Sequence, residues 1–72
     1  MALSKYAMKK TFLSEGKIIH QTELGLLVRF NYQGVFIEHW FPKLGSKFNG
    51  DEVDFVPTFV YEEAISSYKM KG

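Results

Sequence analysis

The sequence predicts a mainly β protein: a small antiparallel partial barrel of four or five strands that ends in one helix. Three closely spaced segments rich in β-branched and aromatic residues carry this prediction, namely 17–22, 25–31 and 35–41. Their short connections favour a meander. A chain of 72 residues is enough for a single domain. We expect residues 10–56 to form the sheet, after a partly ordered lead-in at 1–9.

The first and last strands are less regular than the central three. Residues 10–13 begin the first strand, and Gly16 is suited to a bulge or bend within it. After Pro42, which cannot donate to a strand ladder, residues 43–51 are expected to form a loop with a turn at Asn49-Gly50. Residues 52–56 alternate between apolar and acidic, which predicts a fourth strand or edge.

The connection Asn31-Tyr32-Gln33-Gly34 predicts a hairpin in which Gly34 takes a positive φ after a type I turn. This turn would place Phe30 opposite Phe36, Val28 opposite Glu38 and Leu26 opposite Trp40. The other face would then hold Leu27, Arg29, Val35, Ile37, His39 and Phe41. Both faces would be largely apolar, and both would need cover. Barrel closure covers one face, so we predict that a helix, the N-terminal arm, a second copy or a constitutive partner covers the other.

The last third of the chain predicts a helix over residues 57–69. Pro57 suits the first helical position, and the acidic pair Glu62-Glu63 suits the helix dipole near that end. Apolar side chains at helical spacing form one stripe: Val60, Tyr61, Ala64, Ile65 and Tyr68. The alternative for Phe59-Val60-Tyr61 is an extension of the preceding strand.

Charge and composition exclude several classes of protein. Nine Lys or Arg side chains against eight Asp or Glu give a net charge of +1, far from the strong basic excess of a duplex-binding domain. The first seventeen residues are the basic part. They could contact phosphate or an acidic surface, but a solvated terminal segment is favoured. There is no cysteine, so disulfides and thiolate metal sites are excluded. No apolar run is long enough to span a membrane and no secretory signal is evident, so the cytoplasm is expected.

Catalytic and cofactor patterns are missing from the sequence. The two histidines, His20 and His39, have neither the spacing nor the additional ligands of a zinc site. Glu62 and Glu63 are neighbours on a helix and point in different directions, so they do not form a carboxylate pair. No nucleophile elbow or phosphate-binding glycine loop is present. We therefore expect no enzymatic activity, no cofactor, no metal and no small-molecule substrate.

The strongest candidate site is a surface formed by the second and third strands and the loop after Pro42. It combines aromatic area with cationic groups, in Arg29, Tyr32, Phe36, His39, Trp40 and Lys43. Such residues anchor protein interfaces, and they also bind single-stranded nucleic acid by stacking on bases and neutralising phosphates. The alternative is that Phe36 and Trp40 are simply core residues, and for Trp40 core burial is favoured. The near-neutral net charge favours a protein partner, either another copy of the chain or a different protein.

Part of the sequence resembles a pattern in short phage and plasmid proteins. The residues that carry it are Thr22-Glu23, Leu26-Leu27-Val28, Trp40-Phe41-Pro42-Lys43 and the helix that begins at Pro57. The usual form reads Thr-Glu-x-Ala-x-Leu-x and Trp-Ile-Pro-Lys-Ser, so Gly25 and Phe41 replace the Ala and the Ile. Leu44-Gly45-Ser46 also departs from the usual Ser-Gln-Ile.

This resemblance covers residues 16 to about 65 and implies two things. The first is a small antiparallel barrel of SH3-like type. The second is an origin in a mobile genetic element. The resemblance does not by itself imply any activity. Because small phage proteins often occlude part of a host machine, the resemblance implies an inhibitor or adaptor that binds a host protein.

Overall fold

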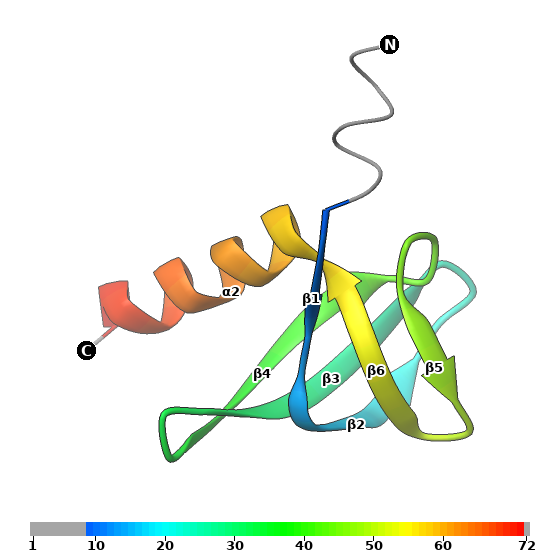
Figure 1. The fold of residues 1–72 in the computed structure, drawn as a ribbon, viewed down its shortest axis with the longest axis horizontal. Coiled ribbons are helices and arrows are strands. Elements are labelled where there is room, and N and C mark those ends of the chain that lie inside the picture. Colours follow the sequence, from blue (N-terminus) through cyan, green and yellow to red (C-terminus); the bar gives the residue numbers. More distant parts are fainter. Residues whose placement is uncertain (1–8, 72) are drawn as a thin grey trace, which may run out of the picture.

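The structure, a computed structural model, describes residues 9–71, so the expected lead-in lies outside it except for Lys9. Within this range the chain forms β1 (Lys10–Phe12), β2 (Ser14–Gln21), β3 (Gly25–Tyr32), β4 (Val35–Pro42), β5 (Lys47–Asn49), β6 (Glu52–Pro57) and α2 (Thr58–Lys71) (Figure 1). The mainly β partial barrel and the C-terminal helix are therefore confirmed. In the described chain, no helix is both long and apolar enough to cross a membrane.

The strands form one antiparallel sheet in the order β1-β6-β2-β3-β4, with β5 also paired to β6. β1 and β2 are two parts of one bent strand, because β6 pairs with both: Pro57 lies opposite Lys10 and Glu52 lies opposite Lys17. If β1 and β2 are counted together, the barrel has five strands. The short strand β5 occupies part of the segment for which the sequence predicted a loop.

The bend between β1 and β2 lies where the sequence predicted it. The pairing of β2 with β3 shifts between Ser14 and Lys17, which marks a bulge. Glu15 has the positive φ of 57°. Gly16 suits this bulge for a different reason. A Cβ atom there would lie 3.1 Å from the Leu13 side chain and 3.1 Å from the Val53 carbonyl oxygen, so these neighbours would have to shift.

The register predicted for the β3–β4 hairpin is wrong by one residue. The closing pair is Tyr32 and Val35, so the turn contains only Gln33 and Gly34. Both residues have positive φ, 52° and 86°, as in a type I′ turn, and the Gly34 N–H donates to Asn31 Oδ1 at 3.0 Å. A type I′ turn twists in the same sense as the strands, which favours it over the longer type I connection.

This register puts the buried hydrophobic residues of the hairpin on one side. Phe30 lies opposite Ile37 and Leu26 opposite Phe41, and all four are buried. The core comprises Leu26, Val28, Phe30, Ile37, Phe41, Val53, Val56, Val60 and Ala64. The prediction that both faces are largely apolar is therefore wrong, because half of the second face is polar: Arg29, Asn31 and Glu38 lie among Leu27, Phe36 and Trp40.

Helix α2 covers the inner side of the barrel and contacts β4, β6 and β1 (Figure 1). Pro57 is the last residue of β6, and the helix begins one residue later, at Thr58. Val60 and Ala64 are buried as the apolar stripe predicted, whereas Tyr68 remains 38% exposed. The ring of Tyr61 packs against that of Phe30, with centroids 5.6 Å apart.

The turn makes a specific prediction about stability. Gln33 adopts a left-handed backbone conformation, which destabilises the fold and which asparagine adopts more readily. Gln33→Asn is therefore expected to raise the free energy of unfolding by up to about 1 kcal/mol. Gln33→Val is expected to lower it, because a β-branched residue fits that conformation poorly. Urea unfolding followed by circular dichroism measures both changes. Equal stability of the two variants would contradict the assigned turn.

Tyr61 predicts how stability depends on pH. Burial, and to a lesser extent the nearby Tyr32, raises the pKa of the Tyr61 hydroxyl above 10.0. The unfolded chain therefore loses this proton first as pH rises. The protonated Tyr61 hydroxyl therefore contributes fully to stability below pH 10.0, and this contribution is lost as the pH rises through the higher pKa of the folded state. Tyr61→Phe should lose less stability than the wild type between neutral and strongly alkaline pH in urea unfolding; an equal loss in both proteins would refute this assignment.

Candidate interaction surface

The second face of the sheet, which we call the outer face, carries the candidate site. It is built on three directly opposite pairs of β3 and β4: Leu27 with Trp40, Arg29 with Glu38, and Asn31 with Phe36. On β2, Lys17 lies opposite Arg29 and His20 lies opposite Leu27. Because opposite residues in antiparallel strands point to the same side, side chains of three strands gather on this face.

A row of charged side chains crosses the outer face from strand to strand. The register aligns Glu52 of β6, Lys17 of β2, Arg29 of β3 and Glu38 of β4. The Arg29 Nε and Nη2 atoms both donate to Glu38 Oε2, at 3.3 and 3.2 Å, and the Lys17 ammonium lies 3.7 Å from Asp51. These side chains are about half exposed or more, so each ion pair adds only about 0.2–1 kcal/mol to stability. Their importance is that each cation already has a carboxylate neighbour.

Aromatic residues flank the charged row. Trp40 is 46% exposed and Phe36 is 55% exposed. The His20 ring meets Trp40 edge-on, with centroids 6.1 Å apart and planes at 89°. Core burial, which the sequence favoured for Trp40, is therefore wrong. The alternating register explains this result, because Phe41 rather than Trp40 points into the core.

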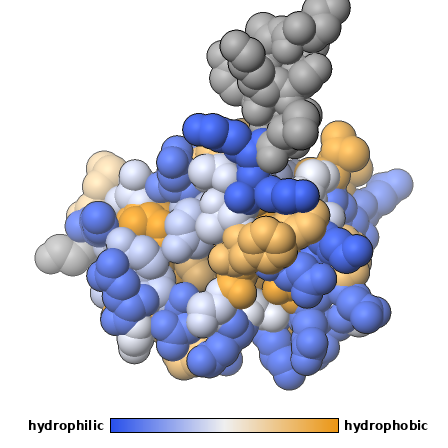
Figure 2. Space-filling view, in the orientation of Figure 1, coloured by the Kyte–Doolittle hydropathy of each residue, from blue (hydrophilic) through white to orange (hydrophobic). Residues whose placement is uncertain are grey.

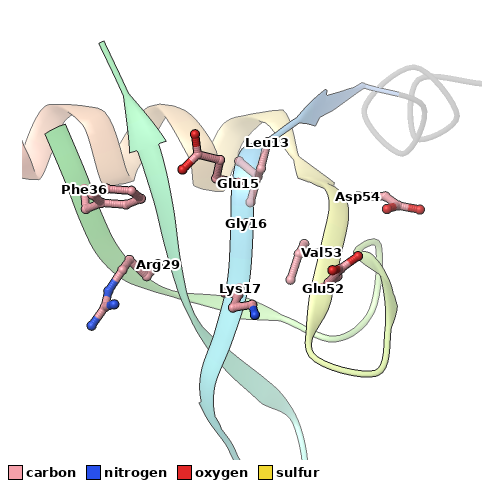
Figure 3. A pocket seen from close by; sticks show the side chains of 9 residues that line it. All are labelled: Leu13, Glu15, Gly16, Lys17, Arg29, Phe36, Glu52, Val53 and Asp54. Carbon is pink, nitrogen blue, oxygen red and sulfur yellow. The ribbon is translucent and has the colours of Figure 1, made fainter. Parts of the chain in front are cut away.

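A hollow of about 420 Å³ lies beside the charged row (Figure 3). Its lining comes from four strands and the β1–β2 bend: Leu13, Glu15, Gly16, Lys17, Arg29, Phe36, Glu52, Val53 and Asp54. The lining contains more carboxylates than cations, and it has no histidine. It therefore offers an amphipathic, slightly acidic depression.

The six residues predicted for the partner site separate into three groups. Arg29, Phe36 and Trp40 lie together on the outer face. Tyr32 and His39 lie on the inner side, where Tyr32 packs against Tyr68 at 6.5 Å and His39 against Phe41 at 5.5 Å. Lys43 follows β4, and its backbone N–H donates to the Leu24 carbonyl at 3.0 Å.

The sequence did not identify His20, Leu27 and Glu38 as part of this surface. They join it only through the strand register, and a correct two-residue turn would have identified Leu27 and Glu38. The same register puts His20 and His39 on opposite sides of the sheet, where they cannot share a ligand. Among residues 9–71 no group of three His, Asp or Glu side chains could hold a metal ion.

A second apolar area appears around β1 on the face shown in Figure 2, where hydrophilic side chains surround it. β1 carries Phe12, which is 68% exposed and packs edge-on against Phe55 at 5.3 Å. The Lys10 ammonium lies 4.6 Å from the centre of the Phe55 ring.

Comparisons with protein-family models, with curated proteins and with solved structures found no match to this chain.

The two neighbouring aromatics of β4 should respond very differently to truncation. Phe41→Ala removes a side chain that is only 1% exposed and should cost about 3–5 kcal/mol, enough to unfold a small domain. Trp40→Ser removes a half-exposed side chain and should cost roughly 1 kcal/mol. Urea unfolding measured by circular dichroism compares them. Comparable losses from the two variants would mean that Trp40 belongs to the core.

Proposed function

We propose that this protein is a non-catalytic interaction module that binds a protein partner through the outer face of β2, β3 and β4. Trp40 and Phe36 are the apolar anchors, and Arg29 with Glu38 supplies the polar contacts. Exposed aromatics beside an arginine are the residues that dominate binding energy in protein interfaces. The resemblance to phage and plasmid proteins extends the proposal to a host protein in the cytoplasm, bound by an inhibitor or adaptor.

The observation that carries this proposal is the charge compensation on the outer face. Arg29 is held by Glu38 at 3.2 Å, and Lys17 lies 3.7 Å from Asp51. Binding to a phosphate backbone requires cations that can release counterions and neutralise phosphates. Here a phosphate would first have to displace a carboxylate, and it would meet further carboxylates at Glu52 and Glu38. A protein surface with both signs of charge fits this arrangement better than single-stranded nucleic acid does.

The test is capture of partners from the native host with matched variants. Phe36→Ser with Trp40→Ser removes the two anchors, and a host protein held by the outer face should bind at least about tenfold more weakly. The control is Leu24→Ser with Leu44→Ser, because these side chains are also exposed, at 80% and 89%, but lie in the connections before β3 and after β4. The control variant should retain the protein.

Equal retention of the captured protein by both variants would refute the outer face as the binding site. Trp40 is the sole tryptophan of the chain, so its fluorescence reports directly on this face. A single-stranded oligonucleotide is expected to leave that fluorescence unchanged. Quenching that weakens steeply from low to physiological salt would replace the proposal with nucleic-acid binding.

A further inference from the structure

β4 lies at the edge of the sheet, with α2 running beside it (Figure 1). Its eight residues pair with β3, and no other strand of the described chain pairs with them. A strand of this length with one unpaired side exposes backbone groups that another extended segment can satisfy.

The register identifies which backbone groups are free. The hairpin closes at Tyr32 and Val35, so Val35 and every second residue after it form hydrogen bonds with β3. The N–H and C=O groups of Phe36, Glu38 and Trp40 therefore point away from β3. Pro42 has no N–H, and its carbonyl accepts the Ser46 hydroxyl at 2.6 Å. The free edge thus consists of the backbone groups of Phe36, Glu38 and Trp40, and it ends at Pro42.

There is space next to this edge. A hollow of about 340 Å³ lies between β4 and α2, lined by residues 36–39 of the strand and by Ala64, Ser67, Tyr68 and Lys71 of the helix. A second hollow, of about 420 Å³, adjoins it and shares His39 and Ser67. An added strand would lie about 4.8 Å from β4, and residues of β4 line both hollows.

The charged row shows what such a strand must carry. The last residue of the row is Glu38, which lies on the edge strand β4. Its carboxylate therefore stands at the free edge, between the exposed rings of Phe36 and Trp40. We propose that the partner adds an extended antiparallel strand to β4, with a Lys or Arg opposite Glu38 and apolar residues two positions before and after it. This proposal rests on the proposed function, because it assumes a protein partner on this side of the molecule.

A second copy of the chain fits this edge less well. Antiparallel self-pairing that places Phe36 opposite Trp40 of the copy also places Glu38 opposite its own equivalent. Directly opposed like charges destabilise a strand pair. A charged residue in the middle of an edge strand is a known protection against such pairing. The same carboxylate that disfavours a second copy favours a basic segment.

The test uses two capped seven-residue peptides, Ser-Val-Thr-Arg-Thr-Val-Ser and the same peptide with a central Glu. Nuclear magnetic resonance should show the amide signals of Phe36, Glu38 and Trp40 shifting and exchanging more slowly with the Arg peptide. Wild-type protein should prefer the Arg peptide roughly three- to tenfold. The variant Arg29→Glu with Glu38→Arg keeps the ion pair and reverses the edge charge, so it should prefer the Glu peptide.

A preference that does not invert in this variant, or shifts on strands other than β4, would overturn strand addition. Shifts that follow protein concentration instead of peptide would assign the edge to a second copy and also overturn it. If the double variant does not fold, Glu38→Gln should abolish the preference, and a retained preference refutes the proposal. Loss of capture by the Phe36 and Trp40 variant does not depend on these results, so the two proposals can fail separately.

Discussion

The arrangement of side chains in this protein depends on the two-residue turn at Gln33 and Gly34. Because side chains alternate along a strand, the turn decides which half of β4 enters the core and which half faces outward. One additional turn residue would bury Phe36, Glu38 and Trp40 with the core residues of β3 and expel Ile37 and Phe41. Burying Glu38 without a partner would cost several kcal/mol, and this cost reinforces the observed register.

Local chemistry predicted the elements of the fold better than their pairing. Apolar, β-branched and aromatic residues in 26–30 identified β3, and Pro57 marked the boundary between strand and helix to within one residue. The pairing of β3 with β4 was not determined in this way, because Gly34 takes a positive φ in both candidate turns. The deciding residue is Gln33, and glutamine carries no signal for the left-handed conformation it adopts. β5 was missed because three residues in a polar segment give too short a pattern.

The same limit explains the candidate site. Composition drew attention to the hairpin, where aromatic and cationic residues concentrate. It could not separate Trp40 from His39, because adjacent strand residues share a sequence neighbourhood but lie on opposite sides of the sheet. The contribution of Glu38 was invisible for a further reason. A single acidic residue among aromatic residues is interpreted as a solvent-exposed side chain without a partner, until the strand register places it opposite Arg29.

The outer face and the free edge of β4 are two views of one physical situation. A domain of this size has few residues to spare, yet it leaves Phe36 and Trp40 about half exposed beside a strand with unpaired backbone groups. Unprotected, such an edge would pair with copies of itself. The carboxylate of Glu38, held in position by Arg29, makes that pairing unfavourable without covering the strand. A charge protects the edge differently from a covering helix or loop. A segment of opposite charge neutralises the protecting charge and can then pair with the strand. In the proposed mode of binding, the edge is therefore closed to like copies and open to a basic partner, and specificity arises from the same residue that disfavours self-pairing.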